Sequence, residues 1–433
     1  MKGFVVRAGS ASGALFLTVL VVQAQVPPPG RLSLPEALAL AERQGYDALL
    51  AQASVASAEA DLSAVRRLPN PLFSGAWVRS TGVPVSGGET TANGYSLSLA
   101  DQGAAEAVLS GKRGLRVREA TEAVSAARSN REDALRLLRL AVAQAFYDAL
   151  AAEASLRVSR KVAESFARAC DLVETRFRYG AVSEADVDRI ETARLEAEQA
   201  ATAAQAQVSQ AKAAFALLLG LDPAVPPELE GSLERESPAW LSAGAPERFV
   251  AEALSARPDV AAARAALSRA DAALALAKRQ RLPDVSLSAA YAREGPEEAP
   301  ITPPTLTLGA TFELPVANQK QGEIARAVSD RVSAKIALDR AEARARTEVL
   351  TAWAAYLAAR TRVERMRGSL LDRARRSRDL VELQYRSGAV SLLDLLDAER
   401  TALSVELEAK QDFDALRSAE AQMAAAIGRS VEP

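Results

Sequence analysis

The sequence predicts a mainly α-helical protein with a small β part, in which one helix-strand-strand-long helix-helix unit occurs twice. Three observations lead to this prediction. Two pairs of segments recur in the same order, two stretches without proline are far longer than ordinary helices, and short stretches alternate polar and apolar residues. The repeats come first, because a duplicated chain has to be read as two copies of one unit.

The duplication is visible in two pairs of segments. Residues 68–70 (Leu-Pro-Asn) correspond to residues 282–284 (Leu-Pro-Asp), each at the end of an alanine-rich helical stretch. Further on, a Gly-Ala-Val-Ser segment at residues 180–183 recurs at residues 388–391. We therefore expect a signal peptide followed by two repeats, at residues 1–24, 25–240 and 241–433.

The expected signal peptide has the three usual parts. Lys2 and Arg7 precede an apolar run at residues 14–22, and small residues up to Ala24 suit a cleavage site. The run is too short for a spanning helix and is soon followed by three prolines, so an uncleaved anchor is the weaker alternative. No cysteine follows the site, which excludes lipidation at an N-terminal cysteine.

Composition excludes several classes of function. Histidine is absent and Cys170 is the only cysteine. This removes a disulfide framework, the usual zinc ligand sets and histidine-based catalysis. A net charge of -2 without a dense basic tract gives no case for nucleic acid. We expect no catalytic residues, no bound metal, no cofactor and no enzymatic activity.

Two stretches predict unusually long helices. Residues 112–179 and 321–387 contain no proline, and their only internal glycines are Gly114, Gly322 and Gly368. At 1.5 Å per residue each would be about 100 Å long. Such lengths are typical of coiled coils. The last helix repeats a seven-then-four spacing of apolar residues at Leu396, Leu403, Leu407, Leu416, Met423 and Ile427. A coiled-coil scaffold without a pore is one alternative function.

Four strands are expected at about 71–80, 94–102, 284–293 and 304–314. In three of them apolar residues alternate with serine, threonine or other small residues, which suits one apolar and one polar face. Strands of this length can span a bilayer when they are tilted. A soluble β-sandwich gives the same local pattern. Single-chain membrane barrels begin at eight strands, so a barrel here requires several chains.

The two long helices end in similar turns. A glycine just past a helix end adopts the left-handed conformation, and a serine three residues later can cap the next helix with an acid at its third position. The pattern occurs twice, as Gly180, Ser183, Asp186 and as Gly388, Ser391, Asp394. Capping is a sufficient structural reason for both aspartates.

Asp397 has no such structural reason, because it lies one turn beyond the cap. It shares a helix face with Asp394, three residues earlier. In a symmetric oligomer that face would form a ring of acids, which attracts cations and selects by charge. A solvated surface charge is the alternative interpretation.

These residues resemble the TolC-type outer-membrane efflux family over essentially the whole mature chain. The most specific segment is residues 385–400, where a tyrosine-glycine turn precedes Leu-Asp-x-Leu-Asp-Ala. The segments at 68–71, 110–113 and 319–325 are similar to the heavy-metal branch, whose members serve cation-exporting RND pumps.

The resemblance implies a homotrimer in the outer membrane of a Gram-negative bacterium. Three copies form a twelve-stranded barrel in outer-membrane lipid, and their long helices form a coiled-coil tunnel through the periplasm. The partners implied are a periplasmic adaptor (membrane fusion) protein and an inner-membrane RND transporter. The function implied is the exit duct of a heavy-metal efflux pump; drug efflux and type I protein secretion are alternatives in the same fold.

The resemblance also implies roles for the turn residues. Asp394 and Asp397 match the constricting aspartates, and Tyr385 matches a tyrosine that holds the entrance shut. The adaptor docks at the periplasmic turns, which here contain Gly180, Ser183, Asp186, Gly388 and Ser391. Where known members keep an arginine between the tyrosine and the first aspartate, this chain has Val390, so the closed state must be held differently.

Overall fold

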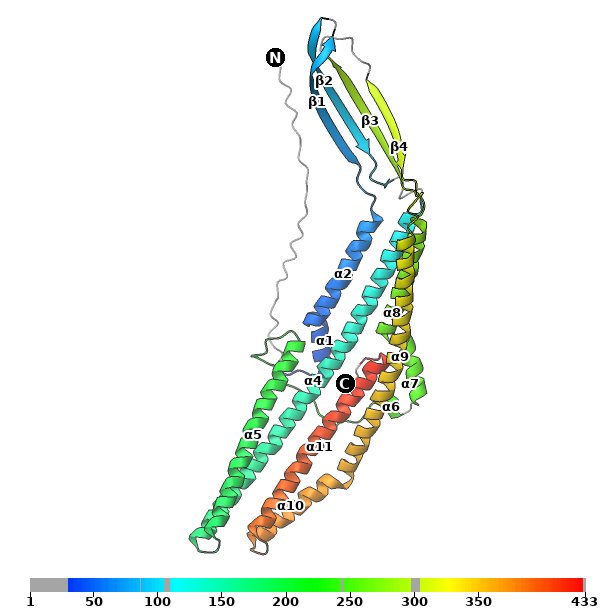
Figure 1. Cartoon of the computed structure of the whole chain (residues 1–433). Coiled ribbons are helices and arrows are strands. Elements are labelled where there is room, and N and C mark those ends of the chain that lie inside the picture. Colours follow the sequence, from blue (N-terminus) through cyan, green and yellow to red (C-terminus); the bar gives the residue numbers. More distant parts are fainter. Residues whose placement is uncertain (1–29, 86, 105–109, 243–244, 297–303, 431–433) are drawn as a thin grey trace.

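The computed structural model describes residues 30–85, 87–104, 110–242, 245–296 and 304–430. The expected signal peptide at residues 1–24 lies outside the described residues. The molecule is elongated, with a four-stranded sheet at one end and two helical hairpins at the other (Figure 1). The expected mainly helical architecture with a small sheet is confirmed. The division into repeats at residues 25–240 and 241–433 stays a prediction.

The sheet is antiparallel with strand order β1-β2-β3-β4. Its strands are β1 (Leu72–Val85), β2 (Gly88–Ala100), β3 (Val285–Pro296) and β4 (Thr305–Phe312). β1 and β2 extend further toward their shared turn than the sequence predicts. The prediction ends too early there because that part is rich in glycine and threonine, and polar and apolar residues hardly alternate in it. β1 and β4 are the outer strands, and within the described residues each leaves one edge without a partner.

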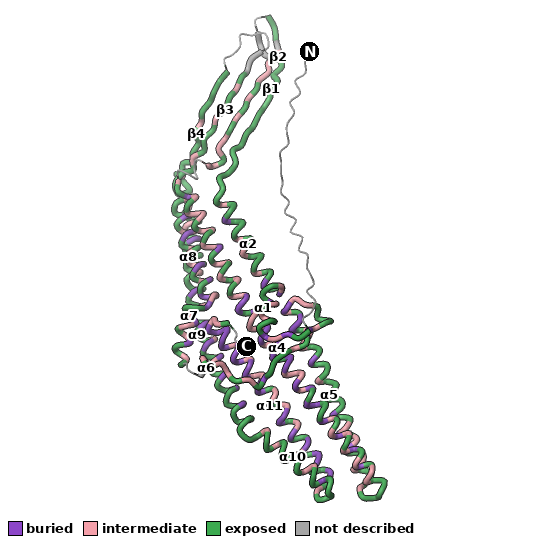
Figure 2. The backbone as a smooth tube through the Cα atoms, turned by 180° about the vertical axis from the view of Figure 1, so that it is seen from behind, coloured by how far each residue is buried: buried purple, intermediate pink, exposed green. Residues whose placement is uncertain are grey.

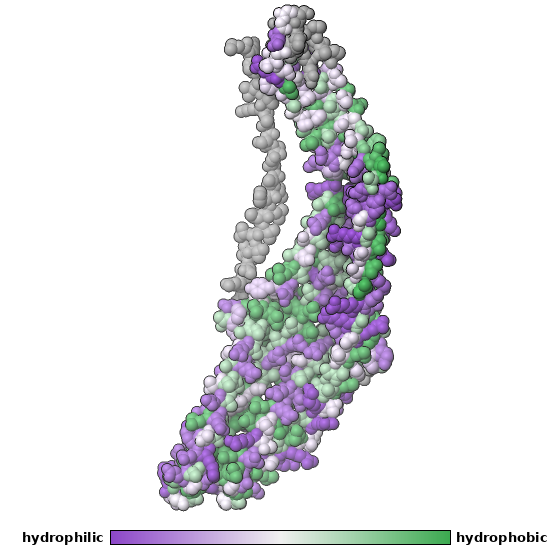
Figure 3. Space-filling view, in the orientation of Figure 1, coloured by the Kyte–Doolittle hydropathy of each residue, from purple (hydrophilic) through white to green (hydrophobic). Residues whose placement is uncertain are grey.

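The register gives the sheet one apolar and one polar face. Phe73 lies opposite Leu99, and Tyr291 opposite Leu306, so their side chains share a face. The apolar face also contains Trp77, Tyr95, Leu97, Leu287, Leu308 and Phe312, all of them exposed in this chain. Serine, threonine and small residues fill most of the other face. In Figure 2 the sheet is mostly exposed, and the surface seen in Figure 3 is largely apolar or neutral there.

Four helices continue from the ends of the strands. α2 (Tyr46–Arg66), α4 (Lys112–Arg178), α8 (Pro258–Arg279) and α9 (Gln321–Arg365) lie side by side in that order (Figure 1). α2 and α9 are therefore the edges of this helical layer. Among the described residues, no helix is both long enough and apolar enough to span a membrane.

The junction between helices and sheet brings together segments that are far apart in the sequence. Lys112, 1% exposed, donates from Nζ to the Leu282 carbonyl (2.8 Å) and contacts Asp284. Arg279 Nε donates to the Ser110 carbonyl (2.8 Å). Segments 110–113 and 282–284, which look unrelated in the sequence, thus meet in one joint.

The helices beyond the middle of the molecule form two hairpins. α4 continues into the first hairpin and turns back as α5 (Glu184–Leu218). In the second, the helix expected over 321–387 is interrupted. α9 is followed by a π-helical segment, η1 (Met366–Leu370), and by α10 (Leu371–Arg386), which pairs with α11 (Leu392–Ile427). The π-helical turn contains Gly368, and the chain bends there (Figure 1), as is usual for such insertions.

The main core lies in the middle of the molecule, where buried residues gather in Figure 2. The short helices α1 (Leu34–Gln44), α6 (Ala239–Ser242) and α7 (Pro246–Ala256) pack there against α4, α9 and α11. The spacing predicted for α11 is confirmed in part. Leu396, Leu416, Met423 and Ile427 are buried, but Leu403 and Leu407 are only half-buried. Ala402, Val405 and Ala409 lie deeper, because their small side chains permit close helix contacts.

Candidate functional site at the hairpin tips

Both hairpin turns have the glycine conformation expected from the sequence. Gly180 and Gly388 have φ values of 69° and 78°. After each glycine, an amide reaches back to close the helix end: Ala181 N donates to Arg176 O, and Ala389 N to Gln384 O, both at 2.9 Å. A side chain at either glycine would strain the backbone, so the shape of both tips depends on these positions.

The expected capping boxes are present at both turns. Ser391 donates from its amide and hydroxyl to Asp394 Oδ2 (2.9 and 2.6 Å), and the Asp394 amide donates to Ser391 Oγ (3.3 Å). Ser183 and Asp186 form the same box at 2.8–3.3 Å. Hydrogen bonds from the serines lower the pKa of Asp186 and of Asp394, so both carboxylates are negative at neutral pH.

Asp394 and Asp397 are both exposed on α11, one turn apart. Asp394 is engaged by its capping box, whereas Asp397 lies beyond it. The structure thus places the two carboxylates on one helix face, as expected. Their role as a gate or a charge filter stays a prediction, as does the docking of an adaptor at the turns.

Tyr385 is buried at the contact between the two hairpins. It is 3% exposed and belongs to an apolar cluster that includes Phe166 and Ile190 of the first hairpin and Leu395 of the second. The Arg176 guanidinium of α4 lies 4.7 Å from the centre of its ring. Burial raises the pKa of the Tyr385 phenol, and the positive charge of Arg176 opposes that rise. The predicted site residue is therefore held between hairpins.

A second buried polar group lies further from the tips. Glu399 of α11 is 3% exposed and accepts a hydrogen bond from Ser165 Oγ of α4 (3.0 Å). Burial raises the pKa of its carboxyl group. It borders a cavity of about 180 Å³ between the hairpins, whose polar lining is Lys161, Ser165, Arg168, Arg378, Glu382 and Glu406. The two hairpins thus meet through charged side chains as well as apolar ones.

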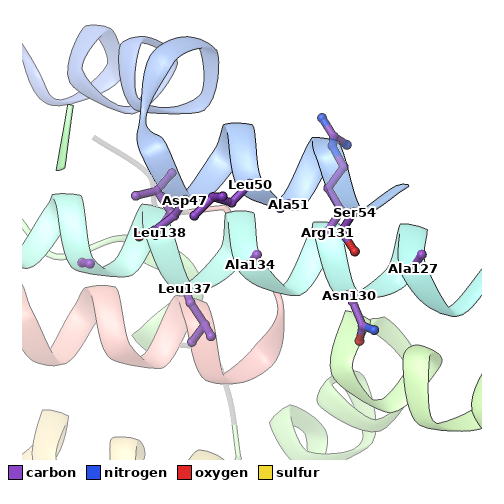
Figure 4. A pocket seen from close by; sticks show the side chains of 11 residues that line it. Asp47, Leu50, Ala51, Ser54, Ala127, Asn130, Arg131, Ala134, Leu137 and Leu138 are labelled. Atoms are coloured by element: carbon purple, nitrogen blue, oxygen red, sulfur yellow. The ribbon is translucent and has the colours of Figure 1, made fainter. Parts of the chain in front are cut away.

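A wider groove lies elsewhere, between α2 and α4 (Figure 4). It has a volume of about 500 Å³. Leu50 and Ala51 of α2 and Ala134 and Leu138 of α4 supply its apolar lining, with Asp47 and Arg131 among its few charged residues. A groove of this composition suits another helix better than a reactive small molecule.

The described residues offer little for metal binding or covalent chemistry. Within them no three histidine, cysteine, aspartate or glutamate side chains form a cluster that could hold a metal ion. Cys170 is buried in the first hairpin, and desolvation together with Glu191 raises the pKa of its thiol to about 11. A thiol with that pKa stays protonated at neutral pH and is a poor nucleophile.

Arg176 and Glu399 are the residues of this site that the sequence did not single out as functional. Each contacts a partner more than 200 residues away along the chain, so no local pattern marks it. The alignment of residues 180–183 with residues 388–391 also brings Glu191 opposite Glu399, which is a weak sequence signal. The structure separates their roles, since Glu191 pairs with Arg194 while Glu399 is buried against the other hairpin.

A model of the family described as outer membrane efflux protein matches residues 38–221 and 249–429. The cobalt-zinc-cadmium resistance protein CzcC of Cupriavidus metallidurans is 23% identical over 385 residues, covering 87% of this chain and 85% of that protein. The pyoverdine export outer membrane protein OpmQ of Pseudomonas aeruginosa is 28% identical over 304 residues. That match covers 68% of this chain and 62% of OpmQ.

Solved structures include a close match in fold. A crystal structure of CusC, from work on folding and transmembrane channel formation, has a TM-score of 0.76 and covers 92% of both chains at 18% identity. The two segments matched by the family model each contain one of the hairpin turns. Both tips thus lie in the segments that this chain shares with the family.

Proposed function

This chain belongs to the outer membrane efflux protein family, and from that premise we propose that it is the exit duct of a tripartite RND-type efflux pump for heavy-metal cations. The observation that carries the proposal is the sheet. Its exposed face is apolar over all four strands, while neither edge has a partner strand in the part of the chain that the structure describes. Such a surface is stable in lipid only when other strands complete it.

Three copies would complete the sheet. Each chain contributes four strands, and three chains give twelve, within the range of closed membrane barrels. In this arrangement β1 of one copy pairs with β4 of the next. The apolar face with Phe73, Trp77 and Leu308 faces lipid, and the serine- and threonine-rich face lines the channel.

The helical layer supports the same assembly through α9. One side of α9 is buried within the chain by Leu338, Val349 and Tyr356. About a third of a turn from that side, α9 carries a second apolar stripe, which is 42–61% exposed: Val328, Val332, Ile336, Leu350 and Leu357. A helix with two separate apolar stripes requires a partner for each. Because α9 is an edge of the layer, the second partner has to come from another copy.

α2, the other edge of the layer, has a matching surface. Its outward side bears Tyr46 and Leu50 near the middle of the molecule and the small residues Ala53, Ala60 and Ala64 toward the sheet. Small residues allow a neighbouring helix with large apolar side chains to approach closely. We therefore place α9 of one copy against α2 of the next, where Leu50 also borders the groove of Figure 4.

The proposed partners follow from the two ends of the duct. The sheet contacts outer-membrane lipid, and the hairpins extend into the periplasm of a Gram-negative bacterium. A periplasmic adaptor docks at the turns around Ser183 and Ser391, and an inner-membrane RND transporter supplies the energy. The likeness to CzcC over 87% of the chain supports heavy-metal cations as cargo. The likeness to OpmQ, a pyoverdine export protein, makes pyoverdine the competing cargo.

A deletion strain tests the cargo. Removing the gene should increase sensitivity to zinc, cobalt and cadmium, and the plasmid-borne wild-type gene should restore resistance. A variant with Gly180→Val and Gly388→Val, which distorts both hairpin tips, serves as a matched inactive control. Unchanged metal sensitivity together with accumulation of pyoverdine in the periplasm would exclude metal cations as cargo.

A further inference from the structure

We propose that a basic pocket at the junction of sheet and helices binds the phosphate group of an anionic phospholipid in the inner leaflet of the outer membrane. The pocket lies between the end of α8, with its link to β3, and the link from β4 to α9, and it has a volume of about 430 Å³. The site rests on the proposed function, because only a sheet embedded in the outer membrane brings this junction to the level of lipid headgroups. The pocket is lined by Lys278, Arg279, Arg281, Leu282, Pro315 and Gln319.

The charged lining of the pocket is entirely cationic. Lys278, Arg279 and Arg281 are exposed, and none of the six lining residues is acidic. In the part of the chain that the structure describes, none of these three cations forms an ion pair. Asp284, the nearest acid along the chain, contacts Lys112. Hydrophilic residues gather at this junction in Figure 3. The three positive charges therefore suit an anionic ligand.

Two guanidinium groups of the pocket are held in place by neighbouring segments. Arg281 Nη2 donates to Gln319 Oε1 (3.1 Å), which joins the two walls of the pocket. Arg279 Nε donates to the Ser110 carbonyl (2.8 Å), so its two Nη groups can face a ligand. Such planar forks of donors match the oxygens of a phosphate. α9 begins just beyond Gln319, and its N-cap residue Lys320 makes no side-chain cap, so the first amides of this helix add to the attraction of an anion.

Apolar side chains beside the pocket favour a lipid over a free anion. Leu314 and Val316 flank Pro315 of the lining and are 67% and 81% exposed. They follow Phe312, which ends β4 on the apolar face of the sheet. Cations next to exposed apolar residues match the boundary between headgroups and acyl chains. A soluble phosphate would leave these side chains in water.

The two ends of the sheet differ in charge. At the end near the helices, the pocket supplies three cations without an acid. At the far end of the described strands, Glu89 and Glu294 balance Arg79 and Arg293. Inner-leaflet phospholipids meet only the end near the helices. Basic residues at that level attract anionic headgroups.

A purely structural role explains only part of this cluster. Lys278 and Arg279 lie in the last turn of α8, where positive charge complements the negative end of the helix. Arg281, however, lies beyond the helix, and Arg279 donates to a carbonyl outside α8. The exposed Leu314 and Val316 have no part in such a role. A phospholipid accounts for the cations and the apolar side chains together.

Native mass spectrometry of the full-length protein in detergent tests the proposal, with phosphatidylglycerol, phosphatidylcholine and inorganic phosphate as probes. The wild type should retain phosphatidylglycerol in preference to phosphatidylcholine. Lys278→Gln combined with Arg281→Gln should weaken phosphatidylglycerol binding on the order of thirtyfold, corresponding to about 2 kcal/mol. The control combines Arg373→Gln and Arg376→Gln, which removes two charges from exposed positions on α10, far from the sheet (Figure 1). It should bind like the wild type.

The outcomes separate a lipid from a free anion and the site from the duct. Leu314→Asn with Val316→Asn should weaken the binding of phosphatidylglycerol but not that of inorganic phosphate. Equal retention of both lipids by the wild type, or equal binding by the pocket variant and the control, refutes the site. Inorganic phosphate that displaces phosphatidylglycerol at equal concentration refutes the lipid as occupant. A wild type that conducts in planar bilayers without a lipid preference refutes the site alone, whereas one that neither assembles nor conducts refutes the duct. Unchanged oligomer mass and melting temperature show that the variants are folded.

Discussion

The second apolar stripe of α9 leads to a quantitative prediction for Leu350→Asp. Leu350 is 51% exposed in one copy, and the proposed assembly buries that part of its surface against α2 of the next. Full burial of a leucine contributes about 1.5–3 kcal/mol, so the exposed half corresponds to roughly 1 kcal/mol for each contact. An unpaired carboxylate at the same place costs several kcal/mol more when it is desolvated. A closed ring of three copies has three such contacts, so the substitution removes this contact free energy three times.

Light scattering of the detergent-extracted protein measures the effect. We expect Leu350→Asp to convert trimers to monomers at concentrations where the wild type remains trimeric. Ala355→Asp is the matched control. Ala355 is also exposed on α9, but its side chain points at least about a third of a turn around the helix away from the residues of the stripe. The substitution therefore introduces the same charge outside the proposed contact. If Leu350→Asp and Ala355→Asp leave equally stable trimers, α9 does not form the contact between copies.

Three further predictions concern the tips and the core. Asp397→Asn should lower the preference for cations over anions in reversal-potential measurements, whereas Asp188→Asn on the exposed side of α5 should not; equal selectivity would remove Asp397 from the conduction path. Ser391→Ala should destabilise the second hairpin by about 1 kcal/mol through loss of the cap, as measured by hydrogen exchange. Because the cap lowers the pKa of Asp394 in the folded state, its stabilising effect is present above the unfolded pKa near 3.9 and is lost as the pH falls through the folded value; a cap effect that grows on acidification would contradict this. Arg417, 1% exposed, donates to Glu420 (2.6 Å) and to the Leu233 and Arg235 carbonyls, so Arg417→Ala should cost about 3–5 kcal/mol. Changing Arg417 and Glu420 together to methionine should cost less in thermal melting, and equal losses would show that the buried charge is not the cause.

The features that the sequence predicted depend on local patterns. A stretch of 67 residues without proline forms the single helix α4, and the Gly-x-x-Ser-x-x-Asp pattern forms both capped turns. Alternation along β2, β3 and β4 marks the apolar face of the sheet, since the side of each residue follows from its position in the strand. These features need no information about distant parts of the chain.

What the sequence did not predict depends on contacts between distant segments. The π-helical break at Gly368 could be suspected from one glycine, but Gly114 lies inside α4 without a break. The partner of each helix end is likewise not a local property, because Arg176 meets Tyr385 only after both hairpins have formed. The outer ends of β1 and β2 were missed for another reason, since residues there have little difference in polarity between the two faces.

Single-particle imaging of the purified protein tests the central claim most directly. The account predicts a threefold-symmetric particle whose sheet wall is continuous, with β1 of each copy hydrogen-bonded to β4 of its neighbour. A particle containing one copy, or a ring in which those two edges remain unpaired, would contradict it.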